Sequence, residues 1–482
     1  MAKPASRPWR RPLLNLSRIY TTLSFSSSSA SSSAAAAGDD SLYQRLSRAG
    51  NPRTSMVPIL EQWLQEGRSV NQDELRFLVT RLRKFRRYIH ALQISEWMGE
   101  IRSMNFSRRD FAVHLDLTAK VHGIERAELY FEMIPCYMRA PQSYGALLNC
   151  YAYTKSPEKA EAIMQKFQEF GFDKSTYPYN VMLKLYYHLG RYDEMDNVTR
   201  QMEAKGIAFD DLTYNIRLNA FVLAGDVKGM ESFIMKMEAD PCYRVNWQDY
   251  AIAANGYLKS GLLDKAQVSL KKAEQLAVGK SKKNAYHTLL TMYARVKSRD
   301  DVYRLWDSYK GSFHVYNKGY TCMVSSLVIL GDVEAAEKVV DENLSRSYDV
   351  QFFATNLLLR AYFEISAVEK AEKLIEKAAV KHGKEARAFT WDAMATGYYK
   401  HGRMEDAVNA MKKALSTIEP QWKPNKLTLV ACLDYLRVKG DSRELEEFMR
   451  LLGDTGKSVM VEDKSVSSDA NEEMELYEVE EG

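Results

Sequence analysis

The stretch TYPYNVMLKLYYHLGRYDEMDNVTRQMEAKGIAFD, residues 176–210, decides the fold of this chain. It contains two apolar stripes with the spacing of a helical face. The first consists of Tyr179, Met182, Leu183 and Tyr186, and the second of Met195, Val198 and Met202. We expect Gly190 to end the first helix, Asp193 to cap the second and Gly206 to end it in a left-handed conformation. One such hairpin cannot cover its own apolar faces, so the pattern predicts similar neighbours.

The same pattern recurs along the chain. On a common phase, eleven units begin near Gln72, Arg108, Pro141, Thr176, Asp211, Trp247, Lys283, Asn317, Phe352, Ala388 and Lys426. One column of the repeat holds Gly190, Gly225, Gly261, Gly331, Gly402 and Gly440. A second column holds Ala91, Ala127, Ala160, Ala266, Ala336, Ala371 and Ala407. Alanine suits a point where two helix backbones approach closely, because it removes side-chain bulk there.

The repeat resembles that of the pentatricopeptide repeat proteins of the P class. That family has a tyrosine followed by a polar residue, a glycine ten positions after the polar residue, an Asp-Glu-Ala-like triplet, a late methionine, and Lys-Gly-Ile before a closing Asp or Asn. Residues 176–210 match nearly all of this pattern. The resemblance implies an all-α fold, a right-handed superhelical solenoid of antiparallel helix-turn-helix repeats.

Composition divides the chain into four segments. Residues 1–38 are rich in Ser and Ala, hold five basic residues and no acidic one, and are expected to be a disordered transit peptide. Residues 39–71 should form helices ahead of the repeats, and residues 72–458 the array of about eleven hairpins. Residues 459–482, with nine acids and one lysine, should form an acidic disordered tail. Without residues 1–38 the formal net charge of +4 becomes −1, so net charge does not identify a partner.

The N-terminal segment also indicates a location in the cell. Arg18-Ile19-Tyr20 before Thr21 resembles a plant mitochondrial processing site. We therefore expect a mitochondrial location, with the plastid as the alternative because it shares the serine richness. No apolar run approaches the roughly 18 residues of a spanning helix, so no membrane partner is expected.

The sequence offers little for catalysis. Residues 453–458, GDTGKS, lack the glycine that a phosphate-binding loop needs at position 451, and a disordered loop is the better interpretation. His114 and His122 lack a third metal ligand, and no HExxH or GxSxG occurs. Cysteines stand far apart, as is typical of buried thiols in a reducing compartment, at Cys136, Cys150, Cys242, Cys322 and Cys432. We expect no enzymatic activity, metal, cofactor or small-molecule substrate.

The resemblance also implies how RNA would be bound. In the pentatricopeptide repeat family one repeat meets one base: the fifth and last residues hydrogen-bond its edge, and apolar second residues sandwich it. Asn180 with Asp210 resembles a pair that prefers uracil, and Asn215 with Asn246 is acceptable for a pyrimidine. Other pairs depart from the usual combinations, namely Gly145 with Ser175, Ala251 with Lys282, His287 with Tyr316, Thr321 with Gln351, Asn356 with Arg387 and Asp392 with Asn425. Among these residues, Thr321, Asn356, Asp392 and Asn425 are further candidates for reading a base.

Two further features bear on this interpretation. Polar residues occupy several second positions, namely Gln142, Gln248, Asn284 and Lys318. Basic residues near the start of the array, Arg83, Lys84, Arg86 and Arg87, are candidates for phosphate contacts.

We therefore expect an organellar protein that holds single-stranded RNA, either messenger or ribosomal, and affects its stability, processing or translation without catalysis. The alternative is a structural helical-repeat component of the mitochondrial ribosome, or another protein-binding scaffold. The weak base code favours that alternative, because packing on a large particle needs shape rather than base readout.

Overall fold

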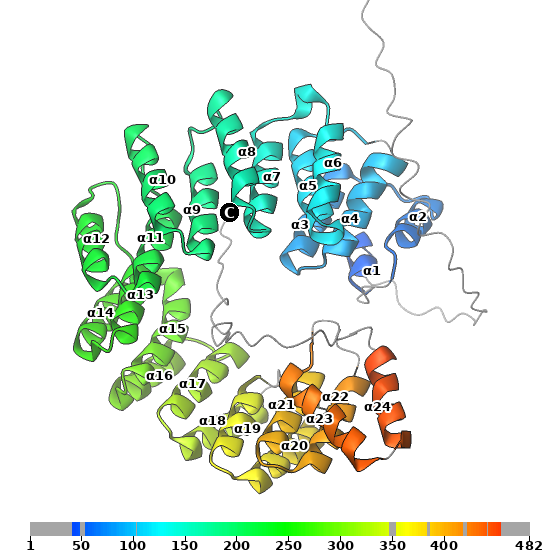
Figure 1. Ribbon diagram of the computed structural model, residues 1–482, viewed down its shortest axis with the longest axis vertical. Helices are drawn as coiled ribbons and strands as arrows, with labels where there is room; N and C mark the ends of the chain where they lie inside the picture. Colours follow the sequence, from blue (N-terminus) through cyan, green and yellow to red (C-terminus); the bar gives the residue numbers. More distant parts are fainter. Residues whose placement is uncertain are drawn as a thin grey trace, which may run out of the picture. The chain divides into compact units, whose positions relative to one another are not determined.

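Helices make up the described part of the chain, apart from turns and short connections, which confirms the all-α prediction (Figure 1). The computed structural model describes residues 41–48, 54–102, 104–346, 353–382, 386–417, 422–440 and 442–454. They fall into two compact units that divide between Val245 and Asn246. The predicted transit peptide and acidic tail lie outside the described residues.

The first unit begins with two short helices and continues with antiparallel hairpins. Its helices are α1 (Leu42–Arg48), α2 (Val57–Gln65), α3 (Gln72–Lys84), α4 (Tyr88–Glu96), the π-helical turn η3 (Trp97–Ile101), α5 (Arg108–His122), α6 (Ile124–Met133), η4 (Cys136–Met138), α7 (Pro141–Tyr153), α8 (Pro157–Glu169), α9 (Thr176–Leu189), α10 (Tyr192–Ala204), α11 (Asp211–Ala224) and α12 (Val227–Ala239). The first helices of successive hairpins, such as α5, α7, α9 and α11, pack against one another.

The second unit repeats this arrangement. Its helices are α13 (Trp247–Lys259), α14 (Leu263–Leu276), η5 (Gly279–Ser281), α15 (Lys282–Arg295), α16 (Arg299–Ser312), α17 (Asn317–Ile329), α18 (Val333–Arg346), α19 (Phe353–Glu364), α20 (Val368–His382), α21 (Ala388–Lys400), α22 (Met404–Ser416), α23 (Lys426–Lys439) and α24 (Ser442–Asp454). Each first helix begins at, or within one residue of, the start predicted for its repeat.

The alanine column explains how the hairpins close. All seven alanines of the column have no exposed surface. Each lies on the second helix of its hairpin, where a larger side chain would have to displace close-packed neighbours. The apolar stripes of residues 176–210 are buried as well, so the periodicity correctly identifies the core faces.

Each hairpin turns through one residue with a positive φ. The six predicted glycines all have φ between 67° and 76°. Gly123 serves the second hairpin, and the remaining four turns use Arg86, Lys155, Lys297 and Ser366, with φ between 53° and 61°. Because L side chains disfavour this region, the four non-glycine turns carry backbone strain that the repeat geometry imposes.

Three local predictions were wrong. Asp193 does not cap α10: the cap residue is Arg191, and Asp193 lies in the first turn, where its charge favours the helix N-terminus. Cys136 and Cys242 are exposed rather than buried: Cys136 begins the short 3-10 turn η4, and Cys242 lies in the connection between α12 and α13. Gly453 and Asp454 end helix α24 instead of belonging to a loop.

Candidate nucleic-acid interface

The pair predicted for uracil is assembled at the junction of α9 and α11. Asn180 projects from α9, and its amide Nδ2 donates to the Asp210 carboxylate, at 2.9 Å from Oδ1 and 3.1 Å from Oδ2. The Thr213 hydroxyl lies 2.8 Å from Asn180 Oδ1 and can donate to it. Thr176 Oγ1 donates to Asp210 Oδ2 from the start of α9. Residues from two consecutive hairpins therefore share one polar cluster.

Asp210 has a second role in the backbone. It is the N-cap of α11 and accepts a hydrogen bond from the backbone N–H of Thr213 at 2.8 Å. Burial acts to raise the pKa of the Asp210 carboxyl, but hydrogen bonds from Thr176, Thr213 and Asn180 outweigh it and hold the pKa below its usual range. The group is therefore an anionic acceptor at neutral pH. Asn180 is only 3% exposed, whereas Asp210 is half-buried.

Exposed apolar side chains occupy the second positions of the two hairpins that form this cluster. Tyr177 is 46% exposed and Leu212 is 42% exposed. The Tyr177 hydroxyl donates to the backbone carbonyl of Gly145 at 3.2 Å. A Cβ on Gly145 would lie 2.8 Å from Tyr177 Cε1, so glycine at this fifth position makes room for the tyrosine ring. The sequence reasoning missed Tyr177 and Leu212, although their place in the second column is a signal that could have found them.

The two residues of the second predicted pair belong to different units. Asn215, on α11 of the first unit, is half-buried, and its Oδ1 has no hydrogen-bond partner among the described residues. Asn246, at the start of the second unit, caps α13 by accepting from the backbone N–H of Gln248 at 2.7 Å. This pair stays a prediction.

Two of the remaining predicted readers, Asn356 and Thr321, differ in their hydrogen bonding. Asn356, on α19, has a buried Oδ1 with no hydrogen-bond partner among the described residues. Thr321 instead donates to the Asn317 carbonyl at 2.9 Å within its own helix, and its predicted counterpart Gln351 lies outside the described residues. Asn356 therefore holds a buried acceptor without a partner, whereas Thr321 is engaged within α17.

Asp392 and Asn425 lie together at the end of the array. Asp392 Oδ1 accepts from the backbone N–H of Asn425 at 3.1 Å, and the Asn425 side chain caps α23. Burial raises the pKa of the Asp392 carboxyl above its usual range. Exposed apolar residues again occupy the second positions around these readers, namely Phe353, Phe389 and Leu427.

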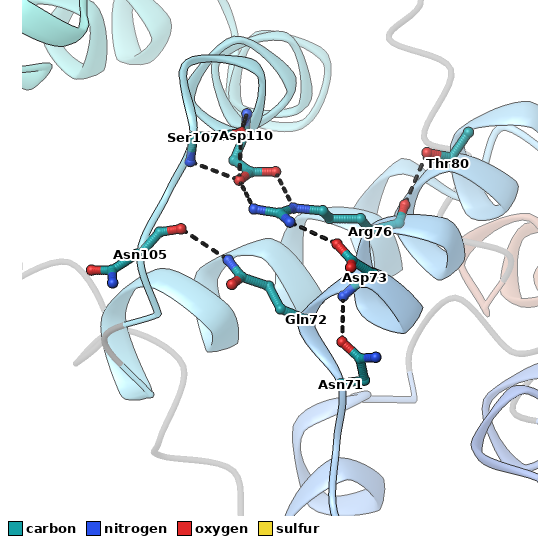
Figure 2. Close-up of polar contacts among 8 residues, drawn as sticks. All are labelled: Asn71, Gln72, Asp73, Arg76, Thr80, Asn105, Ser107 and Asp110. Carbon is teal, nitrogen blue, oxygen red and sulfur yellow. Dashed lines mark hydrogen bonds and ion pairs between the residues drawn. The ribbon is translucent and has the colours of Figure 1, made fainter.

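The first hairpin shows a different arrangement at its fifth position. Figure 2 shows Arg76 of α3 reaching Asp110 in the first turn of α5, with Nε 3.0 Å and Nη2 2.7 Å from the two carboxylate oxygens. Its Nη1 donates to Asp73 at 2.8 Å. Asp110 also accepts from the backbone N–H of Ser107 at 2.8 Å. Three of the five N–H donors of this guanidinium are therefore held by carboxylates, and the side chain joins two hairpins.

The predicted phosphate contacts divide into two kinds. Arg83 forms an ion pair with Asp116 at 2.8 Å, and Arg87 Nε donates to His90 Nδ1 at 3.0 Å. Lys84 and Arg86 are exposed at the end of α3 and in the turn that follows. The two exposed residues are therefore the stronger phosphate candidates.

The described residues offer little that could support other chemistry. In that part of the chain no cluster of three or more His, Cys, Asp or Glu could hold a metal ion. No helix within it is long and apolar enough to cross a membrane. His114 is buried, with Nδ1 2.9 Å from the Ser95 hydroxyl.

Comparison with known proteins gives consistent matches. The family description "PPR repeat" matches residues 142–172, 177–207, 212–242, 319–342 and 389–416. One mitochondrial pentatricopeptide repeat-containing protein of Arabidopsis thaliana is 40% identical over 417 residues, which cover 86% of this chain and 85% of the relative. A second from the same plant, also mitochondrial, is 34% identical over 415 residues, 86% and 84% of the two chains. These relatives confirm the predicted mitochondrial location.

A solved structure agrees with the fold. The crystal structure of the pentatricopeptide repeat protein PPR10 from maize aligns with a TM-score of 0.51 at 15% identity. The alignment covers 83% of this chain and 61% of the maize chain.

Proposed function

This chain belongs to the pentatricopeptide repeat family, and from that membership we propose that it holds single-stranded RNA in mitochondria along the first helices of its hairpins. The observation that carries the proposal is the cluster of Asn180, Asp210 and Thr213. Exposed Tyr177 and Leu212 occupy the second positions of the same two hairpins. A single unpaired base requires apolar side chains against its faces and polar groups at its edge.

The polar groups of this cluster, Asn180 and Asp210, suit uracil. Uracil presents an N–H donor between two carbonyl acceptors, and the anionic Asp210 can accept from that N–H. The Asn180 amide, which now donates to Asp210, can supply a donor to a neighbouring carbonyl. A paired base hides these groups within its duplex, so the site selects single strands.

The exposed apolar side chains at the second positions supply affinity but do not distinguish one base from another. Stacking of a base on an aromatic side chain contributes about 1–3 kcal/mol in single-strand binders. Phe353, Phe389 and Leu427 give the second unit a similar exposed row beside Asn356 and Asp392. The protein therefore acts by occupying RNA, which affects transcript stability, processing or translation, and it performs no chemical step of its own.

Equilibrium binding tests this function. The full chain should bind a uracil-containing single strand and bind the same sequence as a duplex at least tenfold more weakly. Tyr177→Ala should weaken single-strand binding about 5- to 100-fold, as loss of one stacking contact predicts. Tyr153→Ala is the matched control, because Tyr153 is exposed at the end of α7 and is not a second-position residue.

Two outcomes would contradict the proposal. One is equal binding of duplex and single strand, or no binding of either by a chain whose circular dichroism shows it to be folded. The other is stable co-sedimentation with ribosomes in mitochondrial extracts and no free pool bound to transcripts, which would favour the structural alternative.

A further inference from the structure

The row of apolar second positions is interrupted within the second unit. At the seventh and eighth hairpins the second positions are Asn284 and Lys318, both exposed. The fifth position of the seventh hairpin is His287, which is buried and has Nε2 3.0 Å from the Tyr309 hydroxyl. Burial lowers the pKa of His287 to about 4, and the positive charges of Lys318 and Lys283 act in the same direction. This imidazole lies beneath the surface rather than at a base edge.

Basic residues surround that position. Lys282 and Lys283 open α15, Lys318 lies in the first turn of α17, and Tyr316 precedes α17. The Lys283 ammonium lies 4.1 Å from the centroid of the Tyr316 ring, which is 60% exposed. We call Lys282, Lys283, Lys318 and Tyr316 the lysine patch.

The helices that carry the lysine patch hold no acids. Residues 275–299 and 308–331, which include all of α15 and α17, contain neither Asp nor Glu. On α13 the one acid, Asp249, is buried and accepts from the backbone N–H of Asn246. The second helices differ, since their acids join ion pairs such as Arg304 with Glu274 and Lys377 with Asp341. Positive charge therefore collects on the first helices of this part of the unit.

We propose that the lysine patch binds the sugar-phosphate backbone of the RNA, so that the seventh and eighth hairpins hold the strand without reading its bases. The proposal rests on the proposed RNA-binding function and refines it. Lysine ammonium groups neutralise phosphates but do not distinguish one base from another. The second positions Asn284 and Lys318 are not apolar and His287 is buried, so no side chain at these positions is available to read a base. Base selection in the second unit then belongs to α19 and α21, which carry Phe353 with Asn356 and Phe389 with Asp392.

Salt dependence of binding tests this inference on the full chain. The double variant Lys283→Gln with Lys318→Gln should reduce the slope of log affinity against log salt by about 1.4, since each phosphate contact on a single strand contributes about 0.7. The loss should be the same for three single-stranded RNAs of unrelated sequence. The matched control is Lys370→Gln with Lys377→Gln, which removes the same charge from ion pairs on the second helix α20.

The outcomes separate this inference from the proposed function. If the wild-type chain binds single strands and Tyr177→Ala weakens that binding, but the lysine variant keeps the wild-type slope, only the lysine patch is disproved. A loss that depends on RNA sequence, or an equal loss in the control variant, would also overturn it. If the wild-type chain binds no single strand, the proposed function itself fails.

Discussion

At the scale of single residues, Asp210 links the fold to the proposed readout. Its carboxylate caps α11 and also holds Asn180. The sequence predicts that Asn180 and Asp210 belong to one site, because the repeat phase places them at paired positions. It could also have indicated the cap, since Asp210 and Thr213 have the spacing of a capping box. Burial of Asn180 could not be predicted, because it depends on packing between two consecutive hairpins.

The cap allows the two roles of Asp210 to be separated. Asp210→Ala should lower the free energy of unfolding by about 1 kcal/mol, since the N–H of Thr213 loses its acceptor. Asp210→Asn keeps an acceptor and should cost less. Because the folded pKa of Asp210 is lowered, its charge stabilises the protein above about pH 4, and this contribution is lost as the pH falls through the folded pKa. Urea unfolding at pH 7 and pH 3.5 measures both effects, and equal stability of the two variants at pH 7 would contradict the capping role.

His114 gives a second pH dependence at this scale. Burial, and to a lesser degree the charge of His122, lowers the pKa of His114 to about 4. The unfolded chain therefore binds more protons than the folded one between about pH 6.5 and pH 4, so stability should fall as the pH falls through that window. Urea unfolding should show a smaller loss between pH 7 and pH 5 for His114→Gln than for wild type. An identical loss in both proteins would contradict the assignment.

At the scale of elements, the glycine and alanine columns were sufficient to predict most hairpins. Glycine marks the turn because it adopts a positive φ without strain, as at Gly225. The turns at Arg86, Lys155, Lys297 and Ser366 gave no such signal. They could be located only from the repeat phase, because the geometry of the hairpin imposes the same backbone conformation on whichever residue stands there.

The strained turns predict that a glycine substitution there would stabilise the protein. Ser366 has φ 58°, so Ser366→Gly should relieve strain and raise the free energy of unfolding, by about 1 kcal/mol at most. Gly225→Ala is the reverse control and should destabilise by a similar amount. Thermal melts of the three proteins check this, and a lower melting temperature for Ser366→Gly would show that its side chain stabilises the turn.

At the scale of the whole molecule, the residues that build the hairpins recur in more of the repeats than the candidate base-reading residues do. Repeat starts and turns run from α3 to α24, and sequence periodicity predicts them because they follow local spacing. Among the described residues, candidate base sites with apolar second positions occur on α9 and α11 and on α19, α21 and α23. The polar second positions at Gln142, Gln248, Asn284 and Lys318 already indicate this restriction in the sequence. How far the apolar second-position side chains are exposed could not be predicted, because it depends on packing between neighbouring hairpins.

The acidic C-terminal segment gives a prediction at this scale. Residues 459–482 carry a formal net charge of −8 and can compete with RNA for basic surfaces. Deleting them should tighten RNA binding at 20 mM salt, and the gain should shrink at 200 mM salt, where charges are screened over about 7 Å. Unchanged affinity at low salt would count against this competition.

Selection from a randomised single-stranded RNA pool tests the central claim most directly. The wild-type chain should enrich uracil at one fixed position. Asp210→Asn keeps the helix cap and gives this site two asparagines, the same combination as Asn215 with Asn246. The variant should therefore accept either pyrimidine at that RNA position, and its preferences at the other RNA positions should stay unchanged. Equal uracil enrichment by both proteins, or no fixed position in the wild-type selection, would contradict base reading by Asn180 and Asp210.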